Sequence, residues 1–289
     1  SVTAMSILGL IQPPGRITGG DIRWKGESLL GPGGRRRLQK IRGKELAVVF
    51  QDPMTSLNPL FRVDMQIGEV LRRHLGMSRS AARDRVIELL DMVGIPSPKA
   101  RARAYPHELS GGQRQRVMIA MALACEPELL IADEPTTALD VTIQAQILDL
   151  IAELQQRLGL AVLLITHDLG VVAGVCRRVA VMYGGRIMET GPTEDLYEKP
   201  GHPYTHGLLR STPRPDVVLH RLLGIDGSPP SLVDPPPGCP FQARCPLAID
   251  RCTETPPLAR HEHGREVACW RAFETATIDS ERDLEPVGQ

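Results

Sequence analysis

The sequence predicts an α/β domain followed by a proline- and cysteine-rich extension, and three observations support this prediction. Short apolar runs alternate with helical patterns over residues 1–190, as they do in a parallel α/β sheet. Ten of the 25 prolines lie in that part, while fifteen lie in the last 99 residues. Four of the six cysteines lie in the last part as well. We therefore place the domain boundary near Gly191 and Pro192.

Composition and charge exclude several classes of protein. The 34 basic and 34 acidic residues cancel, which argues against a general nucleic-acid-binding surface. A hydrophobic content of 42% is ordinary for a globular protein and excludes global disorder. The longest apolar run, Val117–Cys125, is far shorter than the roughly 18–20 residues that cross a bilayer. Any link to a membrane is therefore expected to run through a partner protein.

The patterns of the first half predict its elements in order. Residues 1–12 have a helical pattern, and residues 17–25 have the pattern of a hairpin that turns at Gly19 and Gly20. Residues 45–50 are a short apolar strand that ends at the polar Gln51. Residues 63–94 hold two or three helices, one of them capped by Ser78 or Ser80.

The second half of the domain alternates helices and strands more regularly. A helix over 110–125 is entered through a Gly-Gly pair, and the strands 129–132 and 161–166 are short and apolar. Between these strands, residues 141–158 carry apolar side chains at helical spacing. A last hairpin, over 179–190, turns at Gly184 and Gly185.

Titratable side chains come directly after two of these predicted strands. Asp133 and Glu134 come after strand 129–132, at the end of a sheet where α/β proteins bind ligands. One carboxylate there can hold Mg²⁺ and the other can orient an attacking water, although a strand-ending Asp that caps a loop is an equal alternative. His167 comes after the next strand and can contact a phosphoryl group, but a structural histidine is the simpler interpretation.

Two further segments have weaker signals. Leu109–Gln113 places a Ser and two glycines before a helix, which suits anion binding at the helix N-terminus, but a plain helix cap has the same pattern. The amide of Gln51 can bridge a metal ion and a moving loop, although a Gln at a strand end is usually only exposed.

Taken together and in this order, five segments resemble the nucleotide-binding domain of ATP-binding-cassette (ABC) proteins. They are similar to that family's Q-loop, signature, Walker B, D-loop and H-loop, and they are Gln51, Leu109–Gln113, Leu129–Glu134, Thr137–Asp140 and His167. The resemblance covers residues 1–190. It implies an α/β fold with a mixed sheet and a helical subdomain at about residues 60–125, in which two copies sandwich two ATP molecules.

The resemblance implies a role for each catalytic candidate. Asp133 would hold Mg²⁺, and Glu134 would act as the general base for the attacking water. His167 would contact the γ-phosphate. Gln51 would sense Mg²⁺ and nucleotide, and would link them to the loop that meets the membrane subunits.

The resemblance also implies residues that act across a dimer of ATPase subunits. The partner's ATP would be held by Ser110, Gly111, Gly112 and Gln113. Asp140 would cross the dimer interface. Whether the second ATPase subunit is identical or a paralogue stays open.

One part of the family pattern is absent. No G-x-x-x-x-G-K-[ST] stretch (Walker A) occurs in the 289 residues. Ser1–Met5 resembles the segment that comes after the Gly-Lys of that motif, so Ser1 would be its terminal Ser, with its hydroxyl on Mg²⁺. We therefore expect a chain cut just after the phosphate-binding lysine, which alone would be inactive. The alternative to such a cut is a subunit that has naturally lost the motif. The presence of Glu134 and His167 makes this alternative less favoured, because a degenerate subunit would not need them.

The extension narrows the resemblance to one subfamily. Gly201–His206, together with Gln51–Pro59, resembles the ATPase subunits of oligopeptide, dipeptide and nickel ABC importers. This implies a peripheral subunit on the cytoplasmic face of the membrane that drives permease subunits through a coupling surface at Gln51–Leu60. A substrate-binding protein would take part indirectly. The alternative is an unrelated proline-rich tail, and the cargo stays open.

The four cysteines of the extension have five, six and sixteen residues between them; they are Cys239, Cys245, Cys252 and Cys269. Cytosolic ATPases rarely keep disulfides, so we expect either a metal site or reduced thiols. Four thiolates can hold Zn²⁺ or a [4Fe–4S] cluster, and the resemblance favours the cluster. His261 and His263 are either substitute ligands or exposed polar residues. The other two cysteines have apolar surroundings and are expected in the core; they are Cys125 and Cys176.

Two other functions compete with a peptide importer. A non-transport ABC ATPase of DNA repair or translation would need a coiled-coil insertion or a basic arm, and the sequence has neither. A regulatory pseudo-ATPase that only completes a heterodimer stays open. A hydrolysis assay with the partner subunit separates it from the importer.

Overall fold

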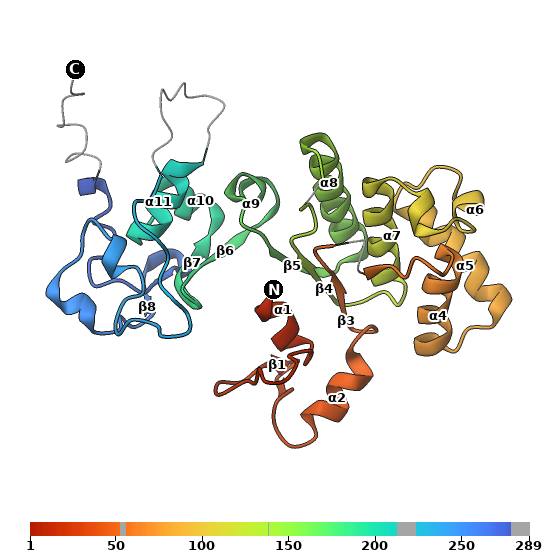
Figure 1. Ribbon diagram of the computed structural model, residues 1–289, viewed down its shortest axis with the longest axis horizontal. Coiled ribbons are helices and arrows are strands. Elements are labelled where there is room, and N and C mark those ends of the chain that lie inside the picture. The colour runs from red at the N-terminus through yellow and green to blue at the C-terminus, as the bar shows by residue number, and fades with distance from the viewer. Residues whose placement is uncertain (53–55, 138, 213–223, 279–289) are drawn as a thin grey trace. The chain divides into compact units, whose positions relative to one another are not determined.

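The computed structural model describes residues 1–52, 56–137, 139–212 and 224–278. The chain is divided into two compact units, residues 1–167 and residues 168–289. The helices and strands found in both units confirm the predicted α/β class (Figure 1). Among the helices that the structure describes, none is both long and apolar enough to cross a membrane.

A three-stranded parallel sheet organises the first unit. Its strands lie in the order β3 (Leu46–Val49), β4 (Leu129–Asp133) and β5 (Ala161–Ile165). The three strands expected at these positions are confirmed. Because parallel strands end on the same side of a sheet, the residues directly after β3, β4 and β5 are brought to one place.

Helices fill the chain between β3 and β4. They are α4 (Val63–Leu75), α5 (Arg79–Met92), α6 (Pro98–Arg101), the 3-10 turn η1 (Pro106–Glu108) and α7 (Gly111–Leu123). Ser78 is the residue that caps α5, since its hydroxyl accepts from the backbone of Ala81 at 3.3 Å. The buried apolar side chains of α4, α5 and α7 form one core with β3 and β4. Each fully buried Leu, Ile or Val stabilises this core by about 1.5–3 kcal/mol.

Helix α8 (Val141–Leu158) has the predicted bounds. Asp140 caps its start, and Gly159 ends it in the left-handed conformation, with φ 65°. The predicted apolar face is buried against the same core at Ile147, Leu150, Ile151 and Leu154.

The first 45 residues differ from the predicted pattern. Helix α1 (Val2–Ile7) is shorter than residues 1–12. The hairpin of β1 (Arg23–Trp24) and β2 (Glu27–Ser28) turns at Lys25 and Gly26, so the predicted turn at Gly19 and Gly20 is wrong. Both turn residues take a positive φ, 50° and 81°, as a two-residue hairpin requires.

Helix α2 (Gly34–Ile41) was not expected, because basic residues dominate its sequence. Its two buried apolar side chains, Leu38 and Ile41, pack in a second core with α1 and Leu29. Burial of these two side chains explains why so polar a segment forms a helix.

The second unit is built on an antiparallel sheet of order β6-β7-β9-β8. Its elements are α9 (Leu169–Val175), β6 (Arg178–Tyr183), β7 (Arg186–Pro192), α10 (Thr193–Glu198), α11 (Pro203–Ser211), η2 (Gln242–Arg244), η3 (Asp250–Thr253), β8 (Ala259–Arg260), η4 (Glu262–Gly264) and β9 (Glu266–Val267). The predicted hairpin over 179–190 is confirmed as β6 and β7. Among the described strands, the parallel and antiparallel pairings lie in separate sheets rather than in one mixed sheet.

Strand β7 runs across the boundary predicted near Gly191. Glu189 and Thr190 of β7 pair with β9, far along the extension. The hairpin of β6 and β7 therefore belongs to the same compact unit as the extension, and the first unit ends earlier, at His167. The division at residue 190, like the helical subdomain at 60–125, stays a prediction.

Candidate functional site

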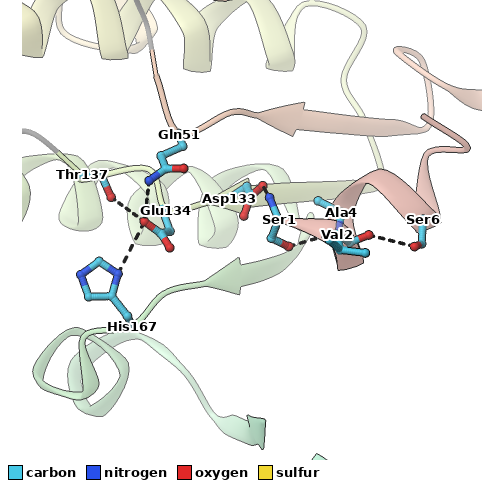
Figure 2. Close-up of polar contacts among 9 residues, drawn as sticks. All are labelled: Ser1, Val2, Ala4, Ser6, Gln51, Asp133, Glu134, Thr137 and His167. Carbon is cyan, nitrogen blue, oxygen red and sulfur yellow. Dashed lines mark hydrogen bonds and ion pairs between the residues drawn. The ribbon is translucent and has the colours of Figure 1, made fainter. Parts of the chain in front are cut away.

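The carboxylate of Glu134 is the centre of the candidate active site. Its Oε2 accepts a hydrogen bond from Nε2 of Gln51 at 2.8 Å and from Oγ1 of Thr137 at 2.9 Å. His167 lies beside the same oxygen, with Nδ1 at 3.5 Å (Figure 2). The structure thus brings together three of the predicted residues, Gln51, Glu134 and His167.

The parallel sheet explains this convergence. Gln51 comes after β3, Glu134 after β4 and His167 after β5, so each lies where its strand ends. Glu134 has a φ of 48°, and its backbone N–H donates to the carbonyl of Ile165 at 2.8 Å. This strained turn directs the side chain away from the strand and toward the residues of the neighbouring strand ends. His167 is open to solvent, with 76% of its side chain exposed.

Asp133 lies at the buried end of β4, with 3% of its surface exposed. The ammonium group of Ser1 contacts one of its carboxylate oxygens, while the other, Oδ1, has no hydrogen-bond partner among the described residues. The hydroxyl of Ser1 caps α1 instead, accepting from the backbone of Ala4 at 3.4 Å. Ser1 and Asp133, both predicted to hold Mg²⁺, are therefore neighbours.

Thr137 is a site residue that the sequence reasoning did not assign. It lies three residues after Glu134 in a tight loop, and this spacing brings its side chain back to Glu134 at the start of the loop. The only signal in the sequence was a hydroxyl residue in the segment similar to the D-loop. The loop is fixed to α8 by Gln144, whose Nε2 donates to the carbonyl of Thr136 at 3.1 Å.

The signature residues form a helix cap. The hydroxyl of Ser110 accepts from the backbone of Gln113 at 3.3 Å, and the Gln113 side chain accepts from the backbone of Ser110 at 3.2 Å. A Cβ on Gly112 would lie 2.8 Å from the side chain of Ile143 of α8, so a larger residue there would force either this side chain or one of the helices to shift. This geometry fits both the plain cap and the anion site that the sequence left open.

Asp140 also acts as a cap. Its carboxylate accepts from the backbone of Ile143 at 2.9 Å, in the first turn of α8. The described contacts of Asp140 and of Ser110–Gln113 join residues three apart within one helix cap. The roles of these residues across a dimer therefore stay predictions. Two parts of the expected site lie outside the described residues. They are Ala138 of the segment similar to the D-loop, and residues 53–55 of the expected coupling surface.

The four cysteines of the extension line one small cavity, together with His202, Leu247 and Trp270 among others; they are Cys239, Cys245, Cys252 and Cys269. Cys239 donates from its backbone to the carbonyl of Cys252 at 2.9 Å. The preceding Gly238, with φ 79°, permits this approach, because a Cβ there would lie 2.2 Å from the Cys252 carbonyl. All six cysteines of the chain have free thiols rather than disulfides.

Burial dominates the chemistry of these thiols. It raises the pKa of Cys245 to about 12 and that of Cys269 to about 11, and it also raises the pKa of Cys239. Metal binding would therefore have to displace protons. Within the described residues, no group of three or more His, Cys, Asp or Glu side chains is arranged to hold a metal ion. The predicted iron–sulfur or zinc site is thus not supported as a formed site.

Two histidines of the extension follow one of the two alternatives expected for them, exposed polar residues. His261 and His263 are exposed, and neither lines the cysteine cavity; the first packs edge-on to Phe273 at 5.0 Å. The histidine at the cavity is His202, which is 1% exposed. Cys125 is buried, as expected, whereas Cys176 is only partly buried.

Comparison with known families gives two matches. Residues 1–137 match the model described as ABC transporter, and residues 188–252 match the model described as oligopeptide/dipeptide transporter, C-terminal region. The chain is 52% identical over 272 residues to a dipeptide transport ATP-binding protein of Bacillus subtilis, covering 93% of this chain and 81% of that protein. It is 50% identical over 274 residues to an oligopeptide transport ATP-binding protein of Salmonella typhimurium, covering 95% and 81%.

Solved structures agree with these matches. One is a dimeric ATP-binding cassette in a post-hydrolysis state, bound to ADP and Pi; it is similar at 29% identity and a TM-score of 0.56, over 66% of this chain and 79% of that one. Another, from Clostridium perfringens, is part of an ABC transporter complex; it is similar at 29% identity and a TM-score of 0.57, over 68% and 74%.

Proposed function

This chain belongs to the ABC transporter family, among the oligopeptide and dipeptide transport ATP-binding proteins, and we propose that it hydrolyses ATP to drive peptide uptake through a membrane importer. The observation that carries the proposal is the convergence of Gln51, Thr137 and His167 on the Glu134 carboxylate. These residues come from the ends of three different strands. A carboxylate that only capped its own loop would need no contacts from the neighbouring strands.

Asp133 is the residue that we assign to Mg²⁺. Its Oδ1 is buried and has no hydrogen-bond partner in the described part of the chain, and a bare carboxylate oxygen is the ligand that Mg²⁺ prefers. Ser1 and Gln51 are the further candidates, since Ser1 lies beside Asp133 and its hydroxyl oxygen suits Mg²⁺, and Gln51 reaches the neighbouring carboxylate. Mg²⁺ bound with ATP supplies positive charge against the phosphate oxygens.

Glu134 is assigned the role of general base. Its Oε2 receives the three polar contacts, which fix the orientation of the carboxylate. These contacts leave Oε1 for an attacking water, whose proton it would accept. His167 is assigned to the γ-phosphate, because its exposed side chain lies beside the base and open to a ligand.

The signature residues and Asp140 are assigned to a dimer. A helix N-terminus with two glycines presents backbone N–H groups to an anion, and Gly111 and Gly112 are the first two residues of α7, directly after the Ser110 cap. The dimeric ATP-binding cassette among the similar structures supports a sandwich of two such subunits. We propose permease subunits as the membrane partners, a peripheral position on the cytoplasmic face of the membrane, and an indirect link to a substrate-binding protein.

The 289-residue chain alone is proposed to bind ATP poorly. It contains no G-x-x-x-x-G-K-[ST] motif, so the β- and γ-phosphates lack a cradle of backbone N–H groups and a lysine. The function is therefore tested on a chimera in which this motif and its preceding strand, taken from an ATP-binding relative, run into Ser1. Mg²⁺-dependent hydrolysis by the chimera with its partner subunits supports the proposal, and no hydrolysis under those conditions contradicts it.

A metal group in the cysteine cavity is a second proposal. Four thiols and one histidine line the cavity, and this donor set suits a [4Fe–4S] cluster or Zn²⁺. An unpartnered buried nitrogen of His202 at the same cavity also fits a missing group. Among the described residues, no three of these side chains are arranged as ligands of one metal ion. Iron and zinc analysis of the purified chain tests the proposal.

A further inference from the structure

The loop between β4 and α8 carries the proposed base at one end and a helix cap at the other. Glu134 begins this loop, and Asp140 ends it as the cap of α8. Two turns lie between them. The backbone N–H of Thr137 donates to the carbonyl of Glu134 at 3.2 Å, and that of Leu139 donates to the carbonyl of Thr136 at 3.3 Å. Both distances are at the long end for backbone hydrogen bonds, so these turns alone hold the loop weakly.

Gln144 of α8 attaches the middle of this loop to the helix. Its Nε2 donates to the carbonyl of Thr136 at 3.1 Å, across eight positions of the chain. Thr136 directly precedes Thr137, whose hydroxyl contacts Glu134. The backbone N–H of Gln144 donates to the carbonyl of Asp140 at 2.8 Å, as in a regular helix. The helix therefore does not need the Gln144 amide, and this amide serves the loop.

Helix α8 is a firm support for this attachment. Its apolar face is buried in the core of the first unit, at Ile147, Leu150 and Leu154 among others. Gln144 precedes Ile147 by three residues, so the two side chains lie on neighbouring parts of the helix surface. Gln144 itself is half-buried. Because packing fixes the helix, the hydrogen bond to Thr136 transmits the position of the helix to the loop.

We propose that Gln144 is a positioning residue for ATP hydrolysis, whose amide holds Thr136 in place and so keeps Thr137 against the Glu134 carboxylate. The inference rests on the proposed role of Glu134 as general base. Gln144 acts through Thr136 and Thr137, so it is not a catalytic residue. A general base must lie within hydrogen-bond reach of the proton that it accepts, and a small displacement of the base lowers the rate.

The alternative is that Gln144 only stabilises the start of α8, and two substitutions separate these roles. Gln144→Glu keeps the size of the side chain, but a carboxylate has no hydrogen to donate to a carbonyl. Its negative charge near the helix N-terminus stabilises the helix. Gln144→Leu removes the amide and keeps a good helix former. Gln146→Leu, at an exposed position of the same helix, is the matched control.

The experiment has a structural part and a kinetic part. On the 289-residue chain, amide hydrogen exchange at Thr137 and Leu139, measured by mass spectrometry with fragmentation, reports how often the loop opens. Thermal unfolding followed by circular dichroism measures the stability of each variant. In the chimera with its partner subunits, steady-state kinetics gives kcat and KM for ATP separately. Each Gln144 variant is also combined with Thr137→Val, because a residue that acts through Thr137 matters little once that hydroxyl is absent.

The expected result is a loop that opens more often and a base that works more slowly in both Gln144 variants. Exchange at Thr137 and Leu139 rises, and kcat falls, by roughly two- to tenfold each, the usual contribution of one neutral hydrogen bond. KM for ATP changes little, and Gln146→Leu behaves as the wild type.

The contrary outcomes are distinct. Unchanged exchange overturns the attachment of the loop by Gln144. Faster exchange with unchanged kcat overturns the positioning role, and so does a Gln144→Glu form that loses neither. A full loss of kcat on top of Thr137→Val excludes the route through Thr137. A wild-type chimera that does not hydrolyse ATP overturns the proposed function and, with it, this inference.

Discussion

Thr137 donates a hydrogen bond from its hydroxyl to Oε2 of Glu134 at 2.9 Å, from three residues further along the chain. This contact lies within one loop, so it does not depend on the neighbouring strands. It gives the proposed base a fixed orientation before nucleotide arrives, and it makes Thr137 a positioning residue for the reaction.

Thr137→Val removes this hydrogen bond at nearly constant volume. A hydrogen bond to a charged group contributes about 1.5–3 kcal/mol, so we expect kcat of the chimera to fall roughly ten- to a hundredfold. KM for ATP is expected to change little, because Thr137 holds the base rather than the nucleotide. Thr137→Ser keeps the hydroxyl and serves as the control. Steady-state kinetics with unchanged kcat in the Val form would contradict the positioning role.

Glu134→Gln tests the base itself. Loss of a general base costs roughly 10²–10⁴ in rate, while the groups assigned to Mg²⁺ and phosphate stay in place. We therefore expect the chimera to keep Mg²⁺-dependent ATP binding and to lose hydrolysis. Glu153→Gln, at an exposed position of α8, is the matched control. Near-normal turnover of the Glu134 variant would remove this residue from the mechanism.

The position of this site could be predicted from the sequence because it depends on strand ends. Each apolar run was short and clearly bounded, so Gln51, Asp133, Glu134 and His167 could be placed at one side of a parallel sheet. The structure confirms these strands. The dimer roles of Ser110 and Asp140 could not be tested in the same way, since their described contacts are helix caps.

His202 and the hairpin of β1 and β2 show what the sequence could not reveal. The backbone of His202 donates to Glu189, thirteen residues earlier, and Glu189 in turn pairs with Arg265, 76 residues away from it, so no local pattern indicates that the ring is buried. The hairpin turns at Lys25–Gly26, where a lysine takes a positive φ. Glycine pairs predict turns well, but here the more conspicuous pair, Gly19–Gly20, lies outside the hairpin.

The buried ion pair of Glu189 and Arg265 is expected to hold the extension together. Arg265→Met leaves the Glu189 carboxylate buried without its charged partner, and breaking a buried pair typically costs about 3–5 kcal/mol. Arg260→Met breaks the exposed pair with Glu266 and is expected to cost at most about 1 kcal/mol. Urea unfolding of the two variants measures the difference. Equal stabilities would show that the buried pair contributes no more than the exposed one.

From the proposed metal group in the cysteine cavity, we predict which metal the purified chain contains. Protein purified without oxygen after iron-replete expression is expected to be brown, with about four irons per chain if the four cysteines hold a cubane cluster. Cys245→Ser is expected to bleach it, while Cys176→Ser, outside the cavity, leaves the colour unchanged. Colourless protein with one zinc per chain would exclude the cluster and keep the metal site. Colourless, metal-free protein would favour free thiols.

Nucleotide binding by the chain as it stands is the last prediction. Ser1, Asp133 and Gln51 can gather round Mg²⁺, but no lysine or glycine-rich loop fixes the β- and γ-phosphates against them. The Ser110–Gln113 cap is assigned to ATP held by a partner, so it does not compensate. We therefore expect very weak binding of a fluorescent ATP analogue by the isolated chain, and binding at least a hundredfold tighter by the chimera. Tight, Mg²⁺-dependent binding by the isolated chain would show that its phosphate site lies elsewhere.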